Sequence, residues 1–120
     1  VRAALPDTQI VAVCGDGSFQ MSLMELATMR QWNLPIKFVI MRNGYLGLVR
    51  EYQHHTYHDR YSGVSLDGSP DFEKIADAYG LDYFHLEHND EMEQRIDEFL
   101  ACEHAAMMVC EVYSFDLVKE

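Results

Sequence analysis

Four short runs of apolar residues along the chain have the composition of β-strands. They cover residues 8–14, 36–41, 81–87 and 106–113. From Ile10 onward the first run is almost entirely apolar. A continuous apolar run of this length predicts a strand buried on both faces, as in a parallel sheet.

The segments between these runs show the three- and four-residue apolar spacing of amphipathic helices. The spacing predicts helices over residues 18–32, 45–53, 69–80 and 89–104. Ser18, Ser69 and Asn89 are expected to cap three of them. Gly80 is expected to end the third. The polar stretch 56–69 is expected to be largely an exposed loop.

The alternation of strands and helices predicts an α/β fold. Such a chain forms a three-layer α/β/α domain with a mostly parallel sheet. With 120 residues the chain has the size of one domain, covering residues 1–120. It does not begin with Met and its first strand follows almost at once. We therefore expect a piece of a longer protein, truncated on its N-terminal side.

Charge and composition exclude some classes of partner. The net charge of −11 argues against nucleic acid, which needs a basic surface. No apolar stretch approaches the ~20 residues of a membrane span, so no membrane partner is expected. Three cysteines without a C-x-x-C pair predict free thiols and a cytoplasmic location. A phosphorylated cofactor is still compatible with this charge, because a divalent cation can reverse the local field.

Unusual residues follow the first two predicted strands. Residues 15–18 read Gly-Asp-Gly-Ser, where glycines permit close approach of a ligand and the next helix offers free N–H groups. Because the negative Asp16 would repel a bare phosphate, a cation is expected between the Asp16 carboxylate and the phosphate. Asn43 and the Tyr45 carbonyl follow the second strand. Asp16, Asn43 and the Tyr45 carbonyl, together with two phosphate oxygens and a water, would supply about six oxygen ligands, the number that Mg²⁺ prefers.

Each half of this pattern also has a simpler interpretation. Asp-Gly and Asn-Gly are common turns, and only their position at consecutive strand ends favours a phosphate–Mg²⁺ site. A non-catalytic α/β module that binds phosphate or Mg²⁺ fits the same residues. His54 and His58 are four residues apart, a spacing that suggests a zinc site. A third ligand is not evident, so we interpret this segment as a polar loop.

The same residues show a resemblance to a known family. The letters GDGSFQ, with Asn43 27 positions after Asp16, resemble the thiamine-diphosphate fingerprint. The longer stretch 15–53 resembles the C-terminal cofactor domain of acetolactate synthase (acetohydroxyacid synthase) large subunits. The resemblance implies the thiamine-diphosphate-binding fold and, as cofactors, thiamine diphosphate and Mg²⁺, with FAD a further candidate in the full-length protein.

The resemblance also implies roles for individual residues. Asp16, Asn43 and the carbonyl of Tyr45 would hold Mg²⁺. Leu48, Val49 and Tyr52 would line the substrate channel. No catalytic residue is expected within this chain, because the family's activating Glu lies in another domain of a neighbouring subunit. The cofactor-binding residues implied are Gly15, Asp16, Gly17, Ser18, Asn43, Tyr45, Leu46 and Gly47.

The implied activity is that of a decarboxylating carboligase. Such an enzyme joins two 2-keto acids, converting pyruvate to 2-acetolactate in branched-chain amino acid biosynthesis. The chain alone is expected to be inactive. The full-length protein is expected to form homo-oligomers, and a regulatory subunit is a further candidate partner.

The sequence departs from the family pattern in three places. Arg42 stands where the family usually has the first Asn of an Asn-Asn pair. Leu48 stands where a Met is common. Tyr52 replaces a Trp tied to the choice of the second keto acid. A related decarboxylase or oxidase therefore remains an alternative.

Overall fold

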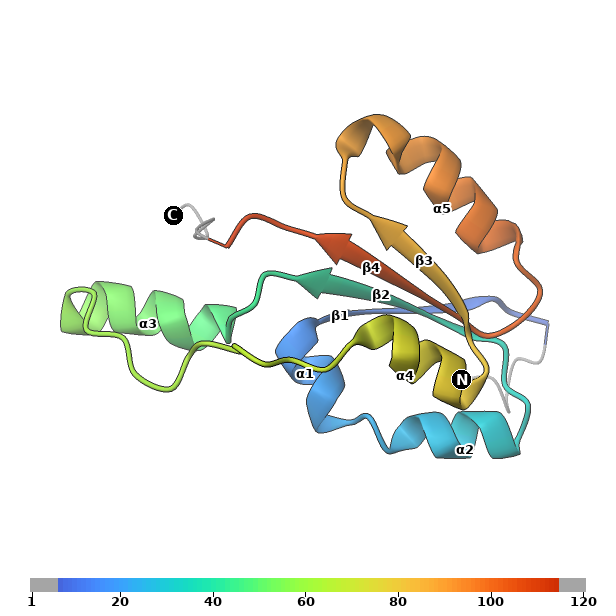
Figure 1. Cartoon of the computed structure of the whole chain (residues 1–120), viewed down its shortest axis with the longest axis horizontal. Helices are drawn as coiled ribbons and strands as arrows, with labels where there is room; N and C mark the ends of the chain where they lie inside the picture. The colour runs from blue at the N-terminus through green and yellow to red at the C-terminus, as the bar shows by residue number, and fades with distance from the viewer. Residues whose placement is uncertain (1–6, 115–120) are drawn as a thin grey trace.

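A four-stranded parallel sheet lies at the centre of residues 7–114, the part of the chain described by this computed structural model (Figure 1). The strand order is β1-β2-β4-β3, and all three pairings are parallel. This confirms the α/β prediction. The remaining parts of the predicted domain, 1–6 and 115–120, lie outside the described residues. The strands are β1 (Ile10–Gly15), β2 (Ile36–Arg42), β3 (Asp82–Leu86) and β4 (Ala106–Glu111).

Helices cover both faces of the sheet, as Figure 1 shows, so the three-layer prediction is confirmed. One face carries α1, α2 and α4, and the other carries α5, which follows a 3₁₀ turn at Asn89–Glu91. The remaining helix, α3, extends beyond the carboxyl ends of the strands. The helices are α1 (Asp16–Met21), α2 (Glu25–Gln31), α3 (Gly47–Tyr57), α4 (Phe72–Tyr79) and α5 (Met92–Ala101).

The core has two parts because side chains alternate across β4. Met107 and Val109 pack with the helices of the first face. Met108 and Cys110 pack against Phe99 of α5 on the other face. Since β4 is buried on both faces, its sequence is a continuous apolar run, as expected for an inner parallel strand.

β1 does not match the prediction of a strand buried on both faces. It lies at the edge of the described sheet, and Val11 and Val13 are exposed, the latter by 67%. Their register partners on β2 are Lys37 and Val39, so they share the face that carries α5. α5 packs mainly against β3 and leaves Val13 of β1 uncovered. The apolar sequence of β1 alone could not show which strands of the sheet α5 would cover.

Several helix boundaries also differ from the predictions. The predicted helix 18–32 is divided at residues 22–24, and its first part begins at Asp16 with Gly15, not Ser18, as N-cap. Asp71 caps α4 in place of Ser69, because its carboxylate directly precedes the helix and accepts the Lys74 N–H at 3.2 Å.

Two further boundaries lie elsewhere than predicted. Asn89 begins the 3₁₀ turn rather than capping α5, so α5 itself is shorter than the predicted 89–104. α3 continues to Tyr57, inside the predicted loop.

Gly80 ends α4 as predicted, and its replacement is expected to destabilise the domain. Its φ is +69°, and a Cβ there would lie 1.9 Å from Nη1 of Arg30, which donates to the Tyr79 carbonyl at 3.0 Å. Gly80→Ala should lower the free energy of unfolding by about 1–2 kcal/mol for the left-handed backbone alone. Thermal melts should show a lower midpoint. The variant Ala78→Gly, in the same helix, measures separately the effect of a change in helix propensity alone. An unchanged midpoint for Gly80→Ala would contradict the prediction.

Within residues 7–114, none of the helices combines the length and hydropathy that a bilayer crossing requires. The three cysteines are free thiols, as the sequence predicted.

Candidate functional site

The carboxyl ends of β1 and β2 open into a cavity of about 440 Å³. All eight residues predicted to bind the cofactor line this cavity, together with Leu48 and Val49 of the predicted substrate channel. The two sequence segments, 15–18 and 43–49, are therefore brought to one place by the parallel pairing of β1 and β2. Ligands in open α/β sheets bind outside this edge, so the position agrees with a binding role.

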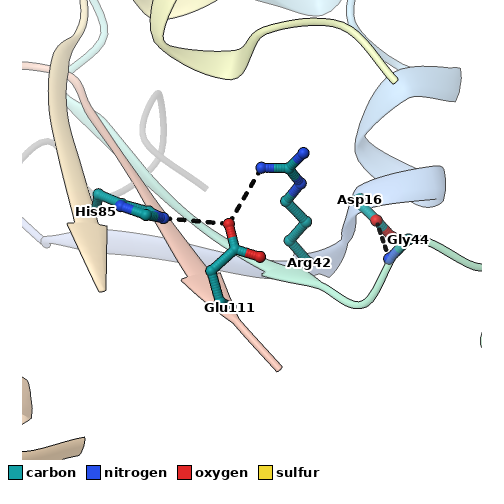
Figure 2. Close-up of polar contacts among 5 residues, drawn as sticks. All are labelled: Asp16, Arg42, Gly44, His85 and Glu111. Carbon is teal, nitrogen blue, oxygen red and sulfur yellow. Dashed lines mark hydrogen bonds and ion pairs between the residues drawn. The ribbon is translucent and has the colours of Figure 1, made fainter. Parts of the chain in front are cut away.

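The Asp16 carboxylate joins these two segments. It is 1% exposed, and its Oδ1 accepts the Gly17 N–H at 3.0 Å. Its Oδ2 accepts the Gly44 N–H at 2.9 Å, as Figure 2 shows. In the described part of the chain no Lys, Arg or His forms an ion pair with it. A buried carboxylate without a counter-charge is costly, and each oxygen retains a lone pair for another partner. These properties suit a cation ligand.

The turn after β2 is fixed by local hydrogen bonds. Oδ1 of Asn43 accepts the Tyr45 N–H at 3.0 Å, and its backbone carbonyl accepts the Ser114 hydroxyl at 2.9 Å. Gly44 between them has a φ of +73°. A carboxylate, an amide oxygen and the Tyr45 carbonyl form an all-oxygen donor set, which suits Mg²⁺ rather than a softer metal. The residues present therefore fit the predicted group.

The glycines leave room at the end of β1. A Cβ at Gly15 would meet nothing within 4 Å, whereas a Cβ at Gly17 would lie 2.7 Å from Cδ2 of Leu46. A side chain at position 17 would therefore require the Leu46 side chain to move, whereas Gly15 leaves free space beside the strand end.

Two predicted backbone donors are already engaged. The Gly17 N–H donates to Asp16, and the Leu46 N–H donates to the Val64 carbonyl at 2.9 Å. A diphosphate would have to exchange these bonds or contact other atoms of the two residues. α1 is also only six residues long, so its dipole adds less than a full helix would. The contacts of these residues with cofactor stay a prediction.

The three predicted channel residues lie on α3. Leu48 is 80% exposed at the rim of the cavity, and Val49 also lines it. Tyr52 is exposed one turn further on, outside the lining, with its ring 5.9 Å from that of Tyr57. Because Leu48 and Tyr52 are four residues apart, they share one face of the helix.

Three lining residues were not predicted from the sequence. Met21 of α1 is exposed and lies at the cavity. Met41 and Val112 also line it, at the ends of β2 and β4. Met41 and Val112 could have been predicted, because ligands bind at the carboxyl ends of the strands and both residues lie there.

The histidines of α3 do not form a metal site. Among residues 7–114 no group of three or more His, Cys, Asp or Glu side chains is placed to hold a metal. Nδ1 of His54 instead lies 2.5 Å from Oδ1 of Asp59, which also accepts the Tyr61 hydroxyl at 2.6 Å. The hydrogen bonds from Tyr61 and His54 hold the pKa of Asp59 below its ordinary value.

Comparison with known proteins gives the family of this chain. Residues 1–112 match the family described as "Thiamine pyrophosphate enzyme, C-terminal TPP binding domain". The chain is 38% identical over 113 residues to "Acetolactate synthase" of Arthrospira platensis, with 93% of this chain and 19% of that protein covered. It is 40% identical over 100 residues to "Acetolactate synthase isozyme 3 large subunit" of Escherichia coli, covering 83% of this chain and 17% of the relative.

A more distant relative extends this similarity. "Probable acetolactate synthase large subunit" of Methanococcus aeolicus is 32% identical over 107 residues, or 89% of this chain and 18% of its own length. The chain thus spans about a fifth of the length of these relatives. The family match covers almost the entire chain, including every residue of the cavity. The chain therefore belongs to the C-terminal, thiamine-diphosphate-binding domain family of thiamine-diphosphate-dependent enzymes.

Proposed function

We propose that this chain provides the diphosphate- and Mg²⁺-binding half of the active site of an acetolactate-synthase-like carboligase. The observation that carries the proposal is the buried Asp16 carboxylate, which has no basic partner among the described residues and joins the two segments of one cavity. The names of the relatives support the reaction class.

The residues of the chain bind and orient the cofactor in this proposal. Asp16, the amide oxygen of Asn43 and the Tyr45 carbonyl would hold Mg²⁺, which would offset the charge of the diphosphate. The open space beside Gly15 would leave room for the cofactor. Thiamine diphosphate, when bound, supplies the electron sink for decarboxylation of a 2-keto acid. Leu48 and Val49 present an apolar rim to a substrate such as pyruvate.

The remaining parts of the site come from outside this chain. Among the described residues that line the cavity, only Asp16 and Tyr45 have titratable side chains. The Asp16 carboxylate is assigned to the metal, and the Tyr45 ring has its centroid 4.2 Å from the Arg50 guanidinium. We propose that the full-length protein forms homo-oligomers that complete the site. The names of two relatives include "large subunit", which supports an association with a further subunit.

Product identity tests the proposed reaction. The full-length protein is incubated with thiamine diphosphate, Mg²⁺ and pyruvate, and then with pyruvate and 2-ketobutyrate. A carboligase gives 2-acetolactate in the first case and adds the mixed product in the second. Acetaldehyde or acetate as the main product would contradict the proposal and assign a decarboxylase or an oxidase. No turnover, with cofactor bound, would favour a non-catalytic binding module.

Tyr52→Trp is expected to change the choice of the second keto acid. The larger indole would add apolar contact beside the exposed face of α3, where Leu48 also lies. One further methylene in the acceptor is worth about 0.8 kcal/mol when buried. The ratio of mixed product to 2-acetolactate, measured in competition, should therefore rise by about fourfold.

Tyr52→Phe is the matched control, since it keeps the ring size and removes only the hydroxyl. It should leave the product ratio near that of the wild type. An equal ratio for Tyr52→Trp and the wild type would show that this position does not face the acceptor.

A further inference from the structure

The exit of β4, residues 111–114, runs beside the exit of β2. The last register pair of the two strands is Arg42 with Glu111. Beyond it, the Val112 N–H donates to the Arg42 carbonyl at 3.0 Å, and the Ser114 hydroxyl donates to the Asn43 carbonyl at 2.9 Å. The exit of β4 therefore holds the backbone of the turn that carries Asn43.

Side chains reinforce this arrangement. Oε1 of Glu111 lies 3.1 Å from Nη1 of Arg42 and 3.1 Å from Nε2 of His85, so one carboxylate joins the ends of β2, β4 and β3 (Figure 2). The arginine at position 42 supplies both the charge and the length that this pair needs. All three side chains are partly exposed, so the pairs orient the strand ends more than they stabilise them.

The backbone of Ser114 is also bound by α3. Nη1 of Arg50 donates to the Ser114 carbonyl. Arg50 is only 5% exposed, and its guanidinium lies 4.2 Å from the ring centroid of Tyr45 and 5.2 Å from that of Tyr61. Ser114 therefore contacts the Asn43 turn with its hydroxyl and α3 with its carbonyl.

We propose that Ser114 is a positioning residue for the metal-binding turn, and that Arg50 acts through it. This inference rests on the proposed function, in which Asn43 binds Mg²⁺. The Tyr45 N–H and the Ser114 hydroxyl hold the amide oxygen and the carbonyl of Asn43. With both bonds made, the amide oxygen is pre-oriented before the metal arrives, and less ordering is needed on binding.

Ser114→Ala isolates this contact, because it removes the hydroxyl and keeps the carbonyl that Arg50 binds. The affinity for Mg²⁺, measured by calorimetric titration of the full-length protein with thiamine diphosphate present, should fall about fivefold, the worth of one ordinary hydrogen bond. Ser114→Thr keeps a hydroxyl and should restore most of the affinity. Ser62→Ala, in the exposed loop after α3, is the matched serine control and should bind Mg²⁺ like the wild type.

A double-mutant cycle tests the role of Arg50. Arg50→Lys keeps the charge but loses the planar group that lies against Tyr45 and Tyr61. It should weaken Mg²⁺ binding in the wild-type background and have little further effect in Ser114→Ala. Full additivity of the two changes would overturn the claim that Arg50 acts through Ser114.

The outcomes separate this inference from the proposed function. Wild-type Mg²⁺ affinity in Ser114→Ala, or Ser114→Thr as weak as Ser114→Ala, would overturn the positioning role and leave the metal site standing. Thiamine diphosphate binding that is independent of Mg²⁺ in the wild type would contradict the metal site itself, and the inference with it.

Discussion

Asp16→Asn in the full-length protein is expected to abolish Mg²⁺-dependent binding of thiamine diphosphate. The carboxylate is the one charged ligand of the proposed set, and its loss leaves only neutral oxygens to hold a hard divalent cation. Even residues that merely support metal ligands are worth about 10- to 100-fold in affinity, so a ligand should cost at least about a hundredfold. Calorimetric titration of thiamine diphosphate with and without Mg²⁺ measures the effect.

The substitution also disturbs local structure, and the experiment must separate the two effects. The introduced side-chain amide would still accept the Gly17 N–H through its oxygen. Its NH₂ group, however, would face the Gly44 N–H, which in the wild type donates to Oδ2 of Asp16. We therefore expect a modest fall in thermal midpoint in the absence of cofactor and metal.

Asp97→Asn, an exposed change on α5, controls for the loss of one negative charge and should bind normally. An Asp16→Asn protein that is folded and keeps the Mg²⁺ dependence of the wild type would show that the cation is held elsewhere.

The location of this site could be predicted from the sequence because its chemistry is local. Each half of the pattern follows directly on a strand, and parallel strands bring their carboxyl ends to the same edge. The role of Gly80 could equally be predicted, since the αL residue at the end of a helix is most often glycine.

What the sequence did not show depends on contacts between distant elements. Ser114 lies 71 residues from Asn43 and 64 from Arg50, and neither spacing leaves a signal in the chain. The exposure of Val13 depends on which part of the sheet α5 covers. Met21 lies in a segment with helical spacing, and spacing alone does not show whether an apolar side chain faces the sheet or the cavity.

Lys37 is a further residue whose role only the structure reveals. It lies within the apolar run of β2 and is 2% exposed, on the face that carries α5. Its Nζ donates to the carbonyl of Cys102, the C-cap of α5, at 2.6 Å, and lies 5.3 Å from the ring centroid of Phe99. The last carbonyls of a helix lack intrahelical partners, and a cation there interacts favourably with the helix dipole.

Lys37→Met is therefore expected to destabilise the domain, although it places an apolar side chain in an apolar setting. Replacing a buried ion pair by apolar residues is often harmless, because both charges disappear together. Here the partners are backbone carbonyls that remain, and the Cys102 carbonyl would lose its donor. The expected cost is about 1–3 kcal/mol. The thermal midpoint should fall, and the amides of α5 should exchange faster with deuterium, which hydrogen-exchange mass spectrometry of the full-length protein resolves by segment.

The matched control is Lys74→Met, which removes an exposed lysine paired with Asp71 on α4. Because that pair is solvated, its loss should leave both the midpoint and the exchange of α5 almost unchanged. Faster exchange throughout the domain in Lys37→Met would indicate general loss of packing around Phe99, whereas an effect concentrated in the last turn of α5 would identify the lost cap. Wild-type exchange in that turn would show that the ammonium contributes nothing to holding α5 on the sheet.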